Sequence, residues 1–199
     1  SKVTAYHMDE YVGLAPDAPQ RFARYLDEHI FSKVNFGKVN YLAGDDGKLN
    51  PVYSDMFTHN RADICFMGIG ENGHIAFNEP GSSLASRTRV KTLNKNTVKA
   101  NARFFDDNTD LVPRNVLTIS IATIMDAKEV MIIASGDKKA KALHCAIEGS
   151  VNHMCPVSIL QMHPHALIVC DEEATSELKA ETVRYFKENE EVKMPQKRR

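Results

Sequence analysis

Short runs of apolar and β-branched residues recur along the chain, at residues 3–8, 39–43, 64–67, 116–122, 130–134, 157–160 and 166–169. Most of these runs are continuously apolar, whereas a strand with one face in water alternates apolar and polar residues. The runs therefore predict strands that are buried on both faces of a sheet.

Helical patterns lie between several of these runs, at residues 19–31, 138–148 and 176–190. In the first of them Phe22, Leu26 and Ile30 recur at four-residue spacing, which places them on one face of a helix. Strands that alternate with helices predict an α/β fold with a largely parallel sheet.

The middle of the chain follows neither period. Residues 72–115 are dominated by glycine, serine and a series of basic residues. A loop region of this length inside a compact domain is either functional or hides an element that the pattern does not reveal. We expect residues 68–115 to form the loops and the lid of an active site.

Composition narrows the classes of function. The length of 199 residues suits one domain, residues 1–199, and the net charge of −1 gives no bulk reason to bind nucleic acid or an anionic membrane. No apolar run approaches the about 18 residues of a membrane helix. Four scattered cysteines and a start without the features of a secretory signal predict a reduced, cytoplasmic protein. Residues 193–199 form a basic tail that we expect to fray.

The string GIGENG at residues 68–73 follows a predicted strand and matches the GxGxxG dinucleotide fingerprint. That fingerprint requires a following helix and an acidic residue about 20 positions on, but Pro80 interrupts the segment and residues 87–96 contain no acid. A tight turn, in which glycine lets the backbone approach another group closely, is the better interpretation.

Acidic and imidazole groups follow two of the predicted strands. Asp9 and Glu10 come after the first strand, and His74 and Glu79 come after the third. If these strands are parallel, the groups share one edge of the sheet, where ligands bind in open α/β folds. Carboxylates and a histidine at one edge could perform acid–base catalysis, although a lone histidine is more often structural.

Several basic residues could bind a small anion. Arg87, Arg89 and Lys91 alternate, so in an extended segment they point the same way. Arg103, and Lys138 or Lys139 at a predicted helix start, could each hold a phosphate, although a charge run is usually a solvated face.

A metal site is a weak alternative. His153, Cys155, His163 and His165 lie close in sequence, but their spacing matches no standard zinc motif, and two prolines interrupt it. We therefore assign no metal.

Together, five strings resemble the glucosamine-6-phosphate deaminases, of the glucosamine-6-phosphate isomerase family. They are MDEYVGL at residues 8–14, GIGENGHIAFNEP at 68–80, SSLASRTRVKT at 82–92, NARFF at 101–105 and VNHM at 151–154. The strings run in order through nearly the whole chain. The resemblance implies a three-layer, open, mostly parallel, Rossmann-like sheet flanked by helices.

The resemblance also implies a reaction in amino-sugar catabolism. The pyranose ring of glucosamine 6-phosphate opens, a proton moves from C2 to C1, and hydrolysis releases ammonia and fructose 6-phosphate. No cofactor is implied. Position by position, Asp9 is the base for the C2 proton, and His74 opens the ring with Asn72 and Glu79 orienting it.

Further site residues carry over by position. Arg103 and Lys139 match phosphate ligands. Ser82, Arg89, Lys91 and Tyr185 match an allosteric site for N-acetylglucosamine 6-phosphate at a subunit interface in hexameric members, so a homo-oligomer is implied.

The sequence departs from the family pattern in two respects. Many members have Asp at the position of Asn72, and a carboxylate stabilises imidazolium by charge whereas an amide does not. The family also begins with a strand–helix–strand segment and a phosphate loop that this sequence does not contain, so we expect an N-terminally truncated or short form. A phosphosugar-binding or regulatory module with weak catalysis is therefore the alternative function.

Overall fold

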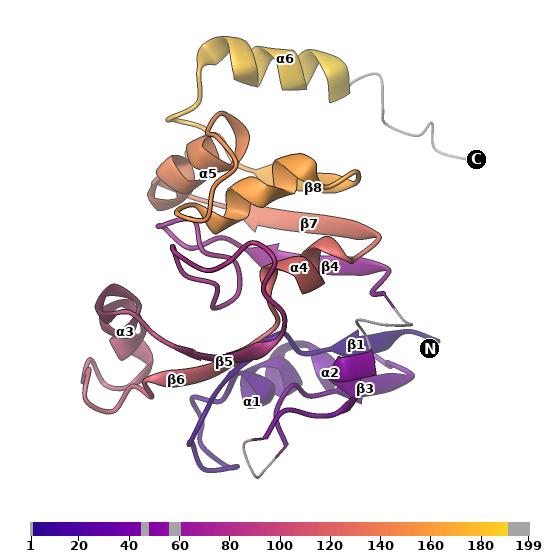
Figure 1. Cartoon of the computed structure of the whole chain (residues 1–199), viewed down its shortest axis with the longest axis vertical. Coiled ribbons are helices and arrows are strands. Elements are labelled where there is room, and N and C mark those ends of the chain that lie inside the picture. The colour runs from indigo at the N-terminus through magenta and orange to yellow at the C-terminus, as the bar shows by residue number, and fades with distance from the viewer. Residues whose placement is uncertain (1, 45–47, 56–60, 191–199) are drawn as a thin grey trace.

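A computed structural model describes residues 2–44, 48–55 and 61–190 (Figure 1); the basic tail predicted at 193–199 lies outside this range. The strands are β1 (Thr4–Tyr6), β2 (Asp9–Tyr11), β3 (Lys38–Asn40), β4 (Ile64–Gly68), β5 (Arg89–Thr92), β6 (Asn115–Thr118), β7 (Glu129–Ala134) and β8 (Ala166–Cys170). The α-helices are α1 (Phe22–Leu26), α2 (Val52–Asp55), α3 (Lys95–Asn101), α4 (Ile121–Met125), α5 (Ala140–Ile147) and α6 (Ala180–Glu190). A π-helix, η1 (Asp27–Phe31), and the 3-10 helices η2 (Ala102–Phe104), η3 (Asp137–Lys139) and η4 (Pro156–Met162) complete the described elements.

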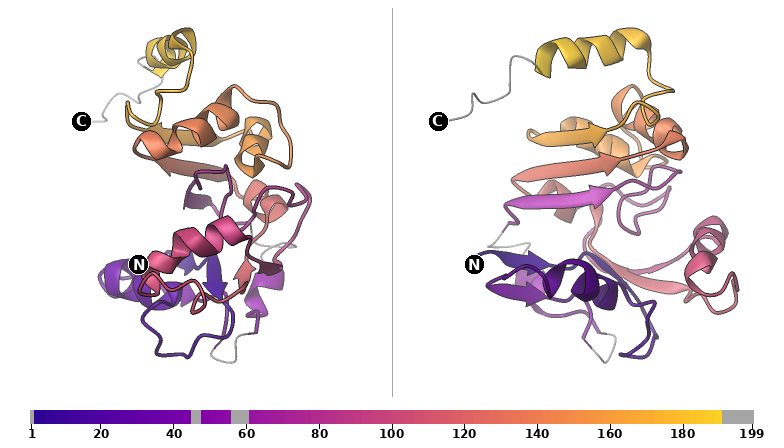
Figure 2. Two further views of the ribbon diagram at one scale, coloured as in Figure 1. Left: turned by 90° about the vertical axis from the view of Figure 1, so that its left-hand side faces the viewer. Right: turned by 180° about the vertical axis from the view of Figure 1, so that it is seen from behind.

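These strands form parallel and antiparallel sheets. β4, β7 and β8 pair in parallel in the order β4-β7-β8 and run side by side in the same direction (Figure 2), and β1 pairs in parallel with β3. β2, β6 and β5 pair in antiparallel fashion in the order β2-β6-β5. The predicted α/β fold with parallel sheets flanked by helices is confirmed.

Three sequence-based expectations about elements differ from the structure. The apolar run at 157–160 is part of the 3-10 helix η4, in which Pro156 occupies the first turn and lacks the N–H that a strand would use. The middle segment 72–115 is not all loop, because it contains β5, α3 and β6. The run at 116–122 also divides, since β6 ends at Thr118 and α4 begins at Ile121.

The register of the β4-β7-β8 sheet separates a buried face from an open one. Met67, Ile132 and Ile168 lie in one row, and Met67 and Ile132 belong to the main core with residues of α5 and η4. Phe66 and Leu167 lie in another row, on either side of the β7 residue Met131, and both are exposed. Helices thus cover one face of this sheet.

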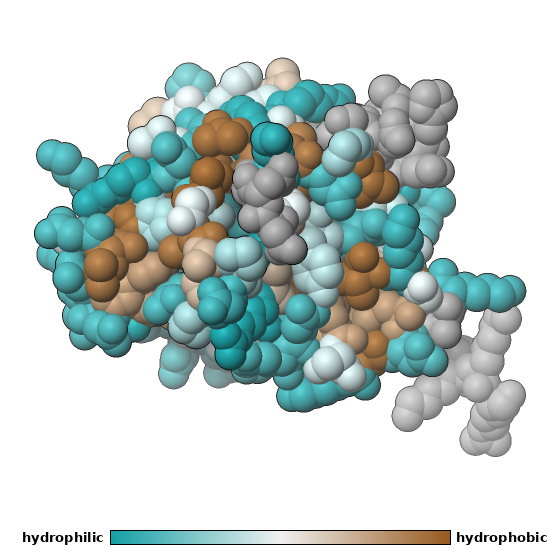
Figure 3. Space-filling model, turned by 90° about the horizontal axis from the view of Figure 1, so that it is seen from below, coloured by the Kyte–Doolittle hydropathy of each residue, from teal (hydrophilic) through white to brown (hydrophobic). Residues whose placement is uncertain are grey.

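Apolar side chains also reach the surface at two other places. At the end of the molecule seen from below, they gather in separate patches among hydrophilic ones (Figure 3). α6 lies beyond β8 at the opposite end of the molecule (Figure 1), and a cavity of about 710 Å³ lies between them. None of the described helices is long and apolar enough to span a bilayer.

Candidate active site

The glycines after β4 make room for a histidine. A Cβ placed on Gly70 would lie 2.2–2.5 Å from ring atoms of His74, which no side chain can tolerate. The Gly70 N–H donates to the His74 carbonyl at 2.9 Å, and the Gly73 N–H donates to the Gly70 carbonyl at 3.0 Å. Gly73 has φ of +82°, in the region that favours glycine. The GxGxxG string therefore forms a turn that closes on His74, and the next segment continues as turns rather than as a helix.

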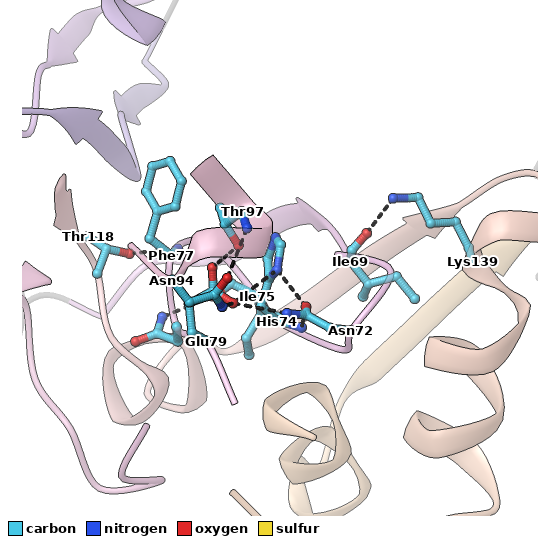
Figure 4. A network of polar contacts seen from close by, with 11 residues as sticks. Ile69, Asn72, His74, Ile75, Phe77, Glu79, Asn94, Thr97, Thr118 and Lys139 are labelled. Atoms are coloured by element: carbon cyan, nitrogen blue, oxygen red, sulfur yellow. Dashed lines mark hydrogen bonds and ion pairs between the residues drawn. The ribbon is translucent and has the colours of Figure 1, made fainter. Parts of the chain in front are cut away.

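His74, Asn72 and Glu79 form a chain of polar contacts (Figure 4). Nδ1 of His74 lies 2.7 Å from Oδ1 of Asn72, and Nδ2 of Asn72 donates to Oε2 of Glu79 at 3.0 Å. The imidazole is also 3.8 Å from that carboxylate oxygen. The structure thus brings together three of the predicted catalytic residues.

These contacts define the protonation state of the imidazole. The Asn72 amide donates through Nδ2 to a carboxylate, so its Oδ1 faces His74 and can only accept; Nδ1 of His74 therefore carries the proton. Burial lowers the pKa of His74, the Glu79 charge opposes this shift, and Lys139 adds to it. The imidazole is neutral near pH 7, and its Nε2, which receives no hydrogen bond from any described residue, can accept a proton.

α3 holds the far side of Glu79. The Thr97 hydroxyl donates to Oε1 of Glu79, and the Asn94 amide donates to Oε2 at 2.7 Å. Asn94 also caps α3, because its Oδ1 accepts the Thr97 N–H at 2.9 Å. Neither residue was predicted from the sequence, although an Asn followed three positions later by Thr is compatible with a helix start.

The loop that carries His74 is attached to β6. The Phe77 N–H donates to the Thr118 hydroxyl at 3.1 Å. The fully buried Asn78 donates to the carbonyls of Ile75 at 3.0 Å and Ile119 at 2.9 Å. Three hydrogen bonds between side chain and backbone therefore fix the loop by its polar groups as well as by the burial of Ile75.

Asp9 lies on β2, which pairs with the same end of β6. In the antiparallel pairing of β2 with β6, Asp9 lies opposite Thr118, and the Ile119 N–H donates to the Met8 carbonyl at 2.9 Å. β2 and the loop that carries His74 are thus both attached at the end of β6, and β2 and β4 belong to different sheets instead of being parallel neighbours along one edge. Burial raises the pKa of Asp9 to about 7, and the Glu10 charge adds to this effect.

Glu10 has a structural role in spite of its place beside Asp9. Its carboxylate accepts the backbone N–H groups of Tyr11, Phe22 and Ala23 at 2.9–3.1 Å, and it lies 3.6 Å from the Arg21 guanidinium. These contacts cap the start of α1 with a fully buried charge. Of the two neighbouring carboxylates, Asp9 is the one without a donor among the described residues.

The two predicted phosphate ligands lie on different sides of this centre. Nζ of Lys139, in η3, donates to the Ile69 carbonyl at 2.9 Å, and its charge acts on His74. Arg103, in η2, lies over the Phe104 ring at 4.7 Å, and its charge partly offsets the burial that raises the pKa of Tyr11. One cation is therefore associated with the His74 loop and the other with the strand that carries Asp9.

The residues of the predicted allosteric site are only partly together. Arg89 and Lys91 share one face of β5, and the Arg89 guanidinium donates to Oδ1 of Asn78 at 3.1 Å and to the Ser120 hydroxyl. The Ser82 hydroxyl is buried and has no hydrogen-bond partner among the described residues. Tyr185 is on α6, on the far side of β8 from β5 (Figure 1), and is 61% exposed.

The weak metal alternative is not supported by the positions of its residues. Cys155 forms a disulfide with Cys145, contrary to the expectation of reduced cysteines. Nε2 of His163 lies 3.0 Å from the Ala127 carbonyl, and its Nδ1 accepts the His165 N–H at 3.0 Å. Among the described residues, no group of three or more His, Cys, Asp and Glu side chains could hold a metal ion.

Comparison with known proteins agrees with the resemblance seen in the sequence. The family model for glucosamine-6-phosphate isomerases/6-phosphogluconolactonase matches residues 1–169. The chain is 46% identical over 196 residues to the glucosamine-6-phosphate deaminase of Tolumonas auensis, covering 96% of this chain and 74% of that protein. The deaminase of Vibrio cholerae is 47% identical over 194 residues, covering 94% and 73%.

Solved structures give the same result. A monomeric glucosamine-6-phosphate deaminase superposes with a TM-score of 0.80 at 35% identity, covering 87% of this chain and 74% of that chain. The 6-phosphogluconolactonase from Trypanosoma brucei, with a TM-score of 0.64 and 16% identity over 87% of this chain and 73% of that one, is similar in fold. With a family model matched over most of its length and relatives that are nearly half identical, the chain belongs to the glucosamine-6-phosphate isomerase/6-phosphogluconolactonase family.

Proposed function

We propose that this chain is an aldose–ketose isomerase that deaminates glucosamine 6-phosphate to fructose 6-phosphate and ammonia. The observation that carries the proposal is the attachment of the Asp9 strand and the His74 loop to the same two residues, Thr118 at the end of β6 and Ile119 directly after it. This shared attachment supports a centre in which a carboxylate and a neutral imidazole act on one substrate. The comparisons support it, because the similar proteins in Tolumonas auensis and Vibrio cholerae are glucosamine-6-phosphate deaminases.

Asp9 acts on the open-chain sugar. Its carboxylate removes the proton from C2, the C2–H electron pair forms the C1–C2 double bond of an enolamine, and the carbonyl oxygen of C1 takes up a proton. Reprotonation at C1 then leaves an imine at C2, which water hydrolyses to the ketone and ammonia. A base with a pKa of about 7 suits this step, because it is both available and strong enough near neutral pH.

His74 opens the pyranose ring. Its Nε2 takes the proton from the hydroxyl on C1 and returns a proton to the ring oxygen as the C1–O5 bond breaks, so the imidazole is unchanged overall. Asn72 and Glu79 keep the Nδ1–H tautomer, which leaves Nε2 as the basic atom. In this proposal Asp9, His74 and water act on the reacting atoms.

Arg103 and Lys139 bind the phosphate in this proposal, because the Lys139 charge acts on His74 and the Arg103 charge acts on Tyr11, in the strand that carries Asp9. We also propose that Ser82, Arg89 and Lys91, with Tyr185 from the last helix, form an effector site for N-acetylglucosamine 6-phosphate at a subunit interface. The link from Arg89 to Asn78 connects that site to the His74 loop. A hexamer is not required for the fold, since a similar structure is that of a monomeric deaminase.

We infer that the protein serves amino-sugar catabolism in the cytoplasm as a hydrolase of a C–N bond. The substrate class follows from the family and from the cations near the centre. The alternative is a module that binds phosphosugars with weak turnover. These two possibilities differ in turnover and not in binding.

An assay for ammonia and fructose 6-phosphate tests the proposal. We expect turnover by the 199-residue chain, its abolition by Asp9→Asn, and no change in Asp110→Asn, whose carboxylate is 93% exposed. Binding of glucosamine 6-phosphate or N-acetylglucosamine 6-phosphate without turnover would favour the regulatory module. Equal activity of Asp9→Asn and the wild-type chain would refute the role of Asp9.

A further inference from the structure

The Glu79 carboxylate is buried and fully engaged, although it lies in a loop. It is 5% exposed. Oε2 accepts from the amides of Asn72 at 3.0 Å and Asn94 at 2.7 Å, and Oε1 accepts the Thr97 hydroxyl. A buried carboxylate requires such donors, because an unpaired charge is costly away from water.

These donors come from two separate segments. Asn72 belongs to the His74 turn, whereas Asn94 and Thr97 belong to the first turn of α3. The two α3 residues also depend on each other, since Oδ1 of Asn94 caps the Thr97 N–H while its Nδ2 holds Glu79. The start of α3 therefore fixes the carboxylate in one orientation.

The orientation of Glu79 determines that of Asn72. With Glu79 as the acceptor of its Nδ2, Asn72 must present Oδ1 to His74, and this oxygen selects the Nδ1–H tautomer. Oε2 of Glu79 lies only 3.8 Å from Nδ1 of His74. A small rotation of the carboxylate would replace the neutral amide by a negative charge as the neighbour of the imidazole.

We propose that Thr97, with Asn94, is a positioning residue that sets the tautomer and the proton affinity of His74 through Glu79. The proposal rests on the proposed function for its effect on turnover, but its effect on the imidazole is independent of any substrate. Loss of the Thr97 hydroxyl leaves Oε1 without its donor and allows Glu79 to move toward His74. A carboxylate closer to the imidazole raises the pKa of His74.

Three variants separate this role from the fold of α3. Thr97→Val removes the hydroxyl and keeps the shape, whereas Thr97→Ser keeps the hydroxyl. Asn94→Asp retains the oxygen that caps Thr97 but replaces the donor to Glu79 by a second carboxylate. Thr92→Val is the control, because it also removes a threonine hydroxyl that donates a hydrogen bond, here to Oδ1 of Asn115 at an exposed position and not to Glu79.

The test combines ring ¹⁵N chemical shifts of His74 across pH, read without substrate, with the pH dependence of kcat and with thermal unfolding. We expect Thr97→Val and Asn94→Asp to raise the pKa of His74 and to lower kcat about tenfold or more near pH 7, with KM changed less. Thr97→Ser and Thr92→Val should match the wild-type chain. An unchanged His74 titration and tautomer in folded Thr97→Val would overturn the proposal.

A His74 titration in Thr97→Ser that differs from that of the wild-type chain would overturn the proposal as well. The hydroxyl, which this variant keeps, would then not be what sets the pKa of His74. If no variant, nor the wild-type chain, released ammonia, the proposed function would fail. The ¹⁵N shifts would still decide whether Thr97 and Asn94 position Glu79.

Discussion

Nδ1 of His74 donates a hydrogen bond to Oδ1 of Asn72 at 2.7 Å. The acceptor is an amide oxygen, so the contact selects a tautomer without placing a negative charge beside the ring. The negative charge lies on Glu79, which is one hydrogen bond further from the imidazole, because the same Asn72 amide donates to Glu79. Asn72 therefore transmits the orientation of Glu79 to His74 and keeps the two groups apart.

Replacement of Asn72 by Asp tests how much the neutral amide matters. Asn72→Asp loses the donor to Glu79 and places two carboxylates in contact, while it provides a charge that stabilises imidazolium. We expect these effects to offset each other, with kcat within about tenfold of the wild-type value, a change of roughly 1.4 kcal/mol in the barrier. The measurement is the steady-state rate of ammonia release, and a gain of several orders of magnitude would contradict the account.

Gly70 is predicted to be essential for the placement of His74. Gly70→Ala introduces a Cβ at 2.2–2.5 Å from the imidazole, so the ring must leave its position beside Asn72. We expect a loss of about 100-fold or more in kcat/KM. Gly68→Ala is the matched control, because its Cβ would make an ordinary 3.8 Å contact with the Ile133 carbonyl. Equal activity of the two variants would show that the turn does not need Gly70.

Asp9 is expected to contribute to activity at the expense of stability. Its pKa is raised to about 7 in the folded chain, so between pH 4 and 7 the folded state binds more protons than the unfolded state, and stability falls as the pH rises. Asn at this position carries no charge to bury. Asp9→Asn should therefore unfold at higher urea than the wild-type chain at pH 8, by up to about 4 kcal/mol, and the difference should fade near pH 4.

The comparison of urea midpoints at the two pH values measures this effect. We expect Asp9→Asn to lose activity and to gain stability. A carboxylate with only a structural role would instead lose stability when it is replaced. A variant that is no more stable than the wild-type chain at pH 8 would be evidence against a destabilising Asp9.

We expect the contribution of His7 to stability to depend on pH in the opposite sense. Its ring is 2% exposed, and burial, with a smaller contribution from the Arg21 charge, lowers its pKa to about 4 against the opposing effect of a hydrogen bond with the Asp9 backbone. The unfolded state then binds the extra proton between pH 6.5 and 4, so stability falls as the pH decreases through this window. The expected loss is about 3 kcal/mol.

His7→Phe removes the titrating group and keeps an aromatic ring beside Tyr41. The loss of unfolding free energy between pH 7 and pH 4 should be smaller in this variant than in the wild-type chain by roughly the same amount. Other carboxylates contribute to both chains and cancel in the difference. Identical acid sensitivity of the two chains would mean that His7 is not buried in its neutral form.

The sequence predicted the strands of the β4-β7-β8 sheet well, because buried parallel strands are continuous apolar runs. The run at 157–160 has the same character but is a 3-10 helix, since an apolar run alone does not distinguish a strand from another buried element. α3 was missed because its exposed residues, such as Lys95 and Lys99, leave few apolar positions to show a period.

The sequence allowed individual residues of the candidate site to be predicted, but not their partners from distant segments. His74, Asn72 and Glu79 lie within one string, and the turn formed by Gly70 and Gly73 brings them together. Partners from distant segments, such as Thr97 and Thr118, could not be found, because a hydroxyl that accepts or donates one hydrogen bond has no sequence signature. The position of Asp9 depends on the antiparallel pairing of β2 with β6, which the apolar pattern of a strand does not specify.

The fate of the hydrogen on C2 tests the central claim most directly. Glucosamine 6-phosphate carrying deuterium at C2 is turned over, and the rate and the position of the label in fructose 6-phosphate are measured by mass spectrometry and NMR. The account predicts slower turnover of the labelled sugar by the wild-type chain, deuterium at C1 in part of the product, and no product from Asp9→Asn. Label transfer by Asp9→Asn at the wild-type rate would contradict it.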